Sequence, residues 1–164
     1  MARKAGGGTP ATEVLEAAGV AFSLHPYEHD PRAASYGMEA AEALGVDPAR
    51  VFKTLVVDVG SDRPELAVGV VPVAARLDLK AIAGALGRKK ATMADPAAAS
   101  RSSGYVVGGI SPLGQRTLLP TVVDESAILH ETILVSGGRR GLDVELAPDY
   151  LVTLLGASYS PIAR

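Results

Sequence analysis

A lysine stands inside a strongly apolar segment of this sequence. Lys53 follows Val51-Phe52 and precedes Thr54-Leu55-Val56-Val57, and such a β-branched, apolar run is typical of a buried strand. A buried ammonium group is costly unless it is paired or faces a polar cavity. Two interpretations follow. Lys53 lies on the solvent face of an edge strand, or it lines a cavity and binds a carbonyl, carboxylate or phosphate group.

Two adjacent glycines open the segment 108–115, which reads Gly-Gly-Ile-Ser-Pro-Leu-Gly-Gln. Paired glycines let the backbone approach a ligand closely. Two N–H groups aimed at a developing oxyanion would stabilise a tetrahedral intermediate. The segment matches neither the P-loop nor the dinucleotide-binding fingerprint. The alternative is an ordinary structural turn.

A second glycine-rich segment, 136–141, reads Ser-Gly-Gly-Arg-Arg-Gly. Its backbone amides and arginines could bind phosphate, or Ser136 could line a pocket at the end of the preceding strand. A solvated hairpin turn is the simpler interpretation.

No protein nucleophile or metal site is evident. The chain has no cysteine and no Gly-x-Ser-x-Gly elbow. His25 and His29 have metal-ligand side chains, but Pro26 and Pro31 exclude the helix on which a zinc-binding His-Glu-x-x-His motif depends. Hydrogen bonding within a loop is the favoured role of these histidines, and no cofactor is expected.

Periodicity and turn residues predict one α+β domain with a mixed, barrel-like sheet and surrounding helices. Residues 1–8 are expected to be a flexible tail and 9–164 the domain. The expected helices are 10–18, 36–44, a turn at 48, 77–86, 96–101 and 148–155. The expected strands are 22–25, 51–59, 66–73, 92–94, a strand start within 104–116, then 118–123, 132–135 and 142–146.

Composition limits the classes of protein. The 164 residues are 48% apolar and 21% charged, which excludes intrinsic disorder for most of the chain. No apolar run approaches the length of a membrane span and no secretory signal is visible, so a cytoplasmic protein without a membrane partner is expected. The net charge of −2 argues against a protein that grips DNA or RNA unaided.

Short blocks of residues follow one another in a specific order and spacing. They are 27–30 (Tyr-Glu-His-Asp), 51–55 (Val-Phe-Lys-Thr-Leu), 72–73 (Pro-Val), 77–80 (Leu-Asp-Leu-Lys), 89–90 (Lys-Lys), 93–96 (Met-Ala-Asp-Pro), 108–115, 119–121 (Leu-Pro-Thr), 135–138 (Val-Ser-Gly-Gly) and 140–142 (Arg-Gly-Leu). From about residue 9 to 164, the chain closely resembles the YbaK/EbsC family of trans-editing Cys-tRNA(Pro) deacylases, which are relatives of the prolyl-tRNA synthetase editing domain.

The resemblance implies a barrel-like α+β domain with the site in its mouth. Lys53 corresponds to the family's key site residue, and the loop 108–112 corresponds to the segment at the aminoacyl ester. In that loop the backbone of Gly108, Gly109 and Ile110 would stabilise the oxyanion, and Ser111 and Pro112 would contact substrate. Further pocket residues implied by the same matching are Tyr27, Thr54, Ser136, Arg139 and Asp143.

The implied reaction is removal of cysteine from mischarged Cys-tRNA(Pro), with Cys-tRNA(Cys) as a further candidate substrate. In the family's proposed route, the substrate thiol attacks its own ester while Lys53 anchors the terminal ribose or phosphate. A transient complex with prolyl-tRNA synthetase is expected. Three alternatives stay open: a deacylase for Ala-tRNA(Pro) or another mischarged tRNA, a non-catalytic tRNA- or nucleotide-binding module, and a metal hydrolase that uses His25 and His29.

Overall fold

The computed structural model describes residues 8–33 and 35–164. The predicted tail lies outside this range except for Gly8, which is exposed. In chain order the elements are α1 (Pro10–Ala18), β1 (Ser23–Pro26), α2 (Tyr36–Leu44), the 3₁₀ helix η1 (Pro48–Arg50), β2 (Phe52–Asp58), β3 (Leu66–Pro72), α3 (Leu79–Ala85), β4 (Thr92–Met93), α4 (Pro96–Ser103), β5 (Thr121–Asp124), the 3₁₀ helix η2 (Glu125–Leu129), β6 (Ile133–Arg139), β7 (Leu142–Leu146), α5 (Pro148–Leu155) and β8 (Ser158–Ser160).

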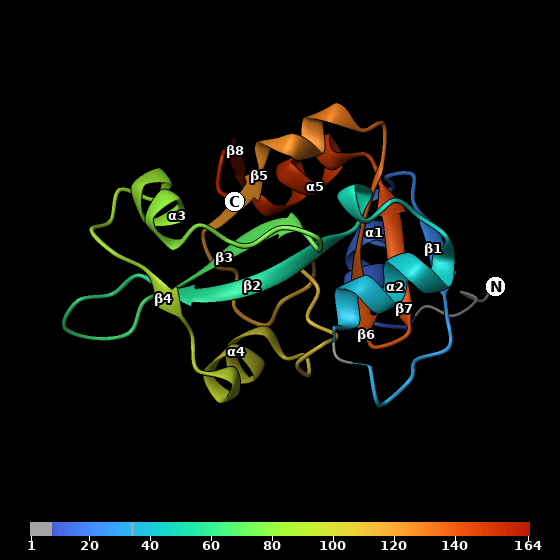
Figure 1. The fold of residues 1–164 in the computed structure, drawn as a ribbon, viewed down its shortest axis with the longest axis horizontal. Helices are drawn as coiled ribbons and strands as arrows, with labels where there is room; N and C mark the ends of the chain where they lie inside the picture. Colours follow the sequence, from blue (N-terminus) through green and yellow to red (C-terminus); the bar gives the residue numbers. More distant parts are fainter. Residues whose placement is uncertain (1–7, 34) are drawn as a thin grey trace.

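The strands form two sheets. A five-stranded sheet has the order β4-β2-β3-β5-β8, and a three-stranded sheet has the order β1-β7-β6. The β3–β5 and β5–β8 pairs are parallel and the other pairs are antiparallel. An isolated bridge between Val51 and Leu134 joins the sheets where β2 begins. Figure 1 shows β2 and β3 crossing the middle of the molecule toward the three-stranded sheet, with α1 and α2 on opposite sides of it. The predicted mixed α+β fold is confirmed.

Local capping explains where the N-terminal helices begin and end. The Thr9 side chain accepts a hydrogen bond from the N–H of Thr12 and caps α1, and Ser35 caps α2 in the same way. Gly19 and Gly45 follow the two helices with φ of 70° and 66°, the left-handed conformation that ends a helix. The predicted bounds of α1, α2 and α5 are confirmed.

The predicted strand start within 104–116 is wrong. Gly104, Gly108 and Gly114 have φ of 83°, 89° and 69°, which is incompatible with an extended strand. The N–H of Gly109 donates to the carbonyl of Val106 at 2.9 Å and closes a tight turn. The whole segment is therefore a loop that returns on itself.

Three further boundaries differ from the predicted ones. The helix predicted at 77–86 begins only at Leu79, because the Asp78 side chain caps it and Leu77 instead forms a bridge with Ala163. The strand predicted at 118–123 begins at Thr121. The strand predicted to end at 135 continues to Arg139 through a bulge.

Two elements, η2 and β8, have no counterpart in the sequence-based prediction. The buried Asp124 carboxylate organises both. Oδ2 accepts from the N–H of Ser126 at 3.1 Å and caps η2, and Oδ1 accepts from the N–H groups of Ile162 and Ala163, both at 2.9 Å. These bonds tie the segment that follows β8 to the end of β5, a long-range link that leaves no periodic pattern in the sequence.

The main hydrophobic cluster packs both sheets against α1 and α5. Phe52 of β2 and Val135 of β6 join Leu15 of α1 and Leu151 of α5, and all four are at most 2% exposed. Dense packing of this kind holds side chains in single rotamers. The start of β2 is therefore a rigid base for whatever lies beside it. Within the described residues, no helix is long and apolar enough to cross a membrane.

Candidate active site

A cavity of about 390 Å³ opens where the two sheets meet. This volume lies within the usual range of small-molecule sites. Most of the cavity wall is apolar, and polar side chains enter it from β2 (Lys53 and Thr54) and from the three-stranded sheet (Ser136, Arg139 and Asp143). The lining residues are Tyr27, Ser35, Tyr36, Gly37, Ala40, the six residues 51–56, Met93, Ala94, Pro96, Ala99, Val107, Gly108, Ile110, Ser136, Arg139 and Asp143.

Most of the site residues expected from the sequence come together at this cavity. They are Tyr27, Lys53, Thr54, Gly108, Ile110, Ser136, Arg139 and Asp143. The structure does not bring Gly109, Ser111 or Pro112 to the cavity wall.

Lys53 is half-buried in the cavity wall, on β2 opposite Val71 of β3. The described residues offer its ammonium no ion pair. Burial, and after it the nearby Arg76 guanidinium, lowers the Lys53 pKa below its ordinary 10.5. The cavity therefore holds a desolvated cation that an anionic or carbonyl oxygen of a ligand would stabilise.

Asp143 lies on the three-stranded sheet at another part of the cavity wall and is only 6% exposed. Burial raises the pKa of this carboxyl from 3.8 to about 7. The neighbouring Tyr27 is half-buried, and burial together with the Asp143 charge raises its pKa to about 12. A cation bound beside Asp143 would lower the carboxyl pKa again, so this wall is suited to a ligand ammonium group.

The raised pKa of Asp143 predicts a pH-dependent stability. Below 3.8 the carboxyl is protonated in both the folded and the unfolded state, and its stabilising contribution is fully present. This contribution is lost as pH rises toward about 7, because the unfolded state ionises first. The free energy of unfolding should therefore fall by a few kcal/mol over this range relative to that of Asp143→Asn. Urea titrations of both proteins at several pH values measure it, and parallel pH profiles would contradict the account.

Thr54 and Ser136 add two hydroxyl groups to the wall. The Thr54 Oγ1 is buried and has no hydrogen-bond partner among the residues that the structure describes. A buried polar atom without a partner costs about 1–3 kcal/mol, which a ligand that bonds it would recover. The Ser136 Oγ accepts from the N–H of Gly138 at 3.1 Å and keeps its own hydrogen to donate.

The backbone N–H groups of the glycine loop, residues 108–112, are not all available to a ligand. Among the described residues, nothing accepts a hydrogen bond from the N–H of Gly108 or of Ile110, and both residues line the cavity. The N–H of Gly109 is already engaged with the Val106 carbonyl. A Cβ atom at Gly109 would stand 2.9 Å from the Arg139 Cα, so this glycine is needed for close packing against the β6–β7 hairpin.

The second half of the segment 108–115 anchors the glycine loop to the core. Ser111 is fully buried, and its Oγ accepts from the N–H of Leu113 at 3.2 Å. The Tyr105 hydroxyl donates to the Leu113 carbonyl at 2.6 Å. Gly114 packs so closely on the first turn of α1 that a Cβ there would lie 2.6 Å from the Pro10 carbonyl carbon. Ser111 and its neighbours thus fix the loop to the core.

The two candidate metal-binding histidines contact two different carboxylates. His25 Nε2 lies 2.7 Å from Glu145 Oε1, and His29 Nδ1 lies 2.9 Å from Glu39 Oε1. Across residues 8–33 and 35–164, no three His, Cys, Asp or Glu side chains come close enough to hold a metal ion. The structure therefore gives the metal-hydrolase alternative no ligand set.

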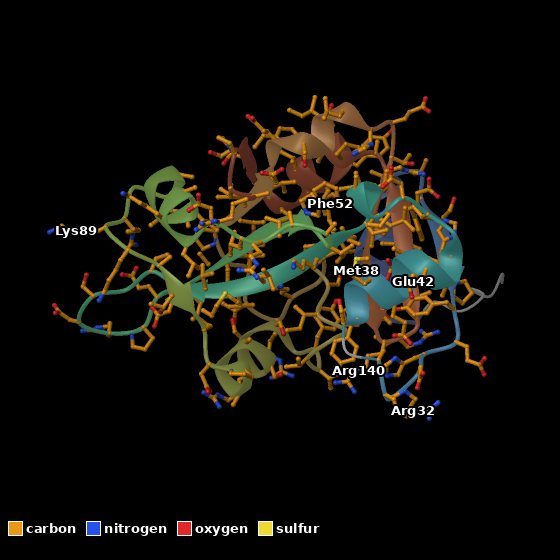
Figure 2. The ribbon with its side chains drawn as sticks, viewed as in Figure 1. Arg32, Met38, Glu42, Phe52, Lys89 and Arg140 are labelled. Atoms are coloured by element: carbon orange, nitrogen blue, oxygen red, sulfur yellow. The ribbon has the colours of Figure 1, made fainter. Side chains whose placement is uncertain are left out.

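The basic run at residues 88–90 lies away from the cavity. Arg88 forms two hydrogen bonds of 2.7 Å with the Glu65 carboxylate. Figure 2 shows Lys89 at the left edge of the molecule, well away from Phe52 and Arg140. This run is a solvated helix end and does not line the site.

Sequence reasoning missed Tyr36. Its position directly after the Ser35 cap indicates only the start of a helix. In the structure its ring lines the cavity and packs on Gly108, where an added Cβ would meet the ring at 2.7 Å. No local pattern connects these two residues, since the contact depends on how α2 and the loop fold together.

The fold and the cavity can now be compared with those of known protein families. The model of the aminoacyl-tRNA editing domain family matches residues 30–154, and the chain belongs to this family. The expected family is confirmed. Enterococcus faecalis has a relative, EbsC, that is provisionally named a Cys-tRNA(Pro)/Cys-tRNA(Cys) deacylase. It is 38% identical over 122 residues, which are 74% of this chain and 73% of the relative.

Solved structures show the same fold. The crystal structure of a hypothetical protein superposes with a TM-score of 0.82 at 26% identity, covering 94% of this chain and 99% of the other. A structure described as a provisional trans-editing enzyme for prolyl-tRNA synthetase has a TM-score of 0.81 at 24% identity. This superposition covers 94% of the present chain and 95% of the solved one.

Proposed function

We propose that this protein is an aminoacyl-tRNA deacylase that removes cysteine from mischarged Cys-tRNA(Pro), with Cys-tRNA(Cys) as a second candidate substrate. The observation that carries the proposal is a lysine that has no counter-ion among the described residues, in a small cavity that the glycine loop also lines. Membership of the editing family supports tRNA as the partner, and the name of the EbsC relative supports cysteine as the amino acid.

The ester between amino acid and ribose is already reactive, so positioning and charge stabilisation can supply the catalysis. The Lys53 ammonium anchors the terminal ribose or phosphate and orients the ester. The N–H groups of Gly108 and Ile110 stabilise the oxyanion, since neither is engaged by the described residues. The Asp143 carboxylate receives the substrate α-ammonium.

In the proposed reaction the thiol of the bound cysteine is the nucleophile, since a thiol is intrinsically very nucleophilic and lies next to the ester that it attacks. Its sulfur attacks the carbonyl carbon of the same residue and forms a carbon–sulfur bond. The bond from that carbon to the ribose oxygen breaks, and the thiol proton passes to that oxygen. The products are free tRNA and a four-membered cyclic thioester of cysteine.

Deacylation of Cys-tRNA(Pro) in the presence of EDTA tests the proposal. The wild-type protein should release tRNA at the same rate with and without the chelator, and should leave the cognate Pro-tRNA(Pro) intact. A rate that falls in EDTA would instead support metal chemistry. Binding of Cys-tRNA(Pro) without any release would make the protein a binding module.

Prolyl-tRNA synthetase is the proposed partner, in a transient complex. The net charge of −2 gives the free protein little attraction for tRNA phosphates. Addition of the synthetase should therefore lower the KM for Cys-tRNA(Pro) about tenfold or more, whereas an unrelated synthetase should not. Tight binding of bare tRNA by the protein alone at physiological salt would contradict this arrangement.

A further inference from the structure

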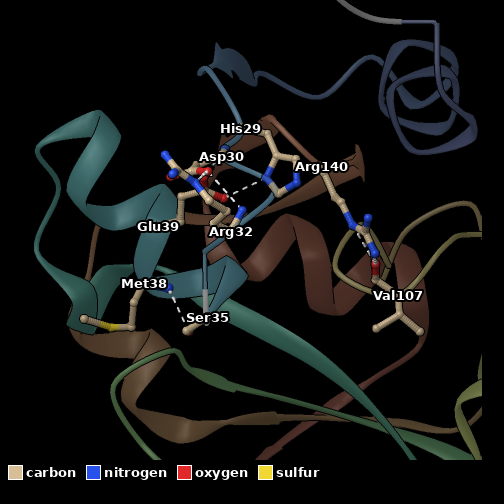
Figure 3. A network of polar contacts seen from close by, with 8 residues as sticks. All are labelled: His29, Asp30, Arg32, Ser35, Met38, Glu39, Val107 and Arg140. Carbon is tan, nitrogen blue, oxygen red and sulfur yellow. Dashed lines mark hydrogen bonds and ion pairs between the residues drawn. The ribbon is translucent and has the colours of Figure 1, made fainter.

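Arg140 donates hydrogen bonds to the backbone at the start of the glycine loop from outside the cavity. It lies in the turn between β6 and β7 and is not part of the cavity lining. Its Nε and Nη2 both donate to the carbonyl oxygen of Val107, at 2.9 and 2.5 Å. Figure 3 shows the guanidinium reaching across to this carbonyl. The bound carbonyl belongs to the peptide that joins Val107 to Gly108.

The same guanidinium also contacts Tyr36, with its Cζ 4.8 Å from the ring centroid. The Tyr36 and His29 ring centroids lie 5.8 Å apart. His29 is held in turn by Glu39, whose other oxygen accepts from the N–H of Asp30 at 2.5 Å (Figure 3). Arg140 is therefore supported by an ordered set of side chains and is not a freely moving surface residue.

The loop backbone fits tightly against this support. A Cβ atom at Gly108 would stand 2.7 Å from the Tyr36 ring and 2.9 Å from the Arg140 Nε. The backbone at Gly108 therefore lies close against both side chains, with no room for a side chain of its own.

This contact has a direct consequence for the donor at Gly108. A peptide is planar, and in the trans form its C=O and N–H point to opposite sides. The described residues contain no cis peptide bond. A guanidinium that fixes the Val107 carbonyl on one side therefore fixes the direction of the Gly108 N–H on the other. A positive charge on the carbonyl oxygen also polarises the peptide and strengthens the N–H as a donor.

We propose that Arg140 is a positioning residue of the deacylation reaction, which orients and polarises the Gly108 N–H through the Val107 carbonyl. The inference rests on the proposed function, because it assigns the Gly108 N–H to the oxyanion. Arg140 itself does not touch the substrate. Its loss should leave substrate binding nearly intact and slow the chemical step.

Two measurements on Arg140→Ala test this role. The kcat for Cys-tRNA(Pro) should fall about tenfold to a hundredfold with KM changed less than about threefold, since one oxyanion donor is worth about a hundredfold to a thousandfold. Guanidinium ion at a non-denaturing concentration should restore part of the kcat. Amide hydrogen exchange of the peptide covering 106–110 should become faster in the variant. Arg88→Ala, which removes another exposed arginine with two hydrogen bonds to one residue, is the control and should change none of these quantities.

The possible results separate the inference from the proposed function. A wild-type protein with no deacylase activity would overturn the proposed function. Unchanged exchange of 106–110 in Arg140→Ala would overturn the inference whatever the activity. An unchanged kcat would also overturn the inference. A higher KM at constant kcat would overturn it as well, because Arg140 would then be a tRNA-binding residue.

Discussion

Replacing Lys53 by methionine should lower kcat/KM for Cys-tRNA(Pro) deacylation by about a hundredfold to a thousandfold. Methionine preserves most of the side-chain volume and removes the charge. In the cavity the ammonium has no counter-ion among the described residues, so its interaction with a ribose or phosphate oxygen is not weakened by competition. Initial rates of tRNA release measure the effect.

The same substitution should not destabilise the fold. Burial lowers the Lys53 pKa, which means that the folded protein bears a cost for keeping the side chain charged. The methionine variant should therefore have an unchanged or higher Tm. Lys89→Met is the matched control, because Lys89 is exposed and lies far from the cavity. Loss of activity in both variants, or in neither, would contradict the role of Lys53.

Gly108→Ala should be the second most damaging change, lowering kcat by about a hundredfold. Gly108 has φ of 89°, a conformation that alanine adopts only at a cost. The new Cβ would also collide with the Tyr36 ring at 2.7 Å, so the loop must move and its donors with it. Single-turnover rates at saturating enzyme would isolate the chemical step.

Gly84→Ala provides the control for this substitution. Gly84 lies within α3, and beyond its own helix a Cβ there would meet no atom of the described residues within 4 Å. Alanine favours the helix by about 1 kcal/mol over glycine, so this variant should be fully active and slightly more stable. A Gly108→Ala protein with wild-type kcat would show that the geometry of this loop does not limit the reaction.

The features predicted well from the sequence are local ones. Thr9 and Gly19 lie within one turn of the helix that they delimit, and the bounds of that helix are confirmed. Lys53 stands out because its immediate neighbours are apolar, and it does line the cavity. In each case the informative residues are close together along the chain.

The features that were missed depend on contacts between distant segments. The glycine-rich motif appears uniform in the sequence, yet Gly108 and Ile110 line the cavity while Ser111 is buried as an anchor. Only the tertiary structure reveals this division, because it follows from packing of the loop on α1. The roles of Tyr36 and Asp124 are likewise set by partners that no local pattern reveals.

Substrate selectivity and its dependence on Lys53 decide between the proposed function and its alternatives. The deacylation rates of Cys-tRNA(Pro), Ala-tRNA(Pro) and Ser-tRNA(Pro) should be measured side by side for the wild-type protein and Lys53→Ala. We expect release from Cys-tRNA(Pro) to be at least about tenfold faster than from the other two, since serine has a poorer nucleophile than a thiol and alanine has none. We also expect this activity to be lost in Lys53→Ala. Equal rates on all three substrates would contradict the thiol-assisted mechanism, and full activity in Lys53→Ala would contradict the assignment of the site.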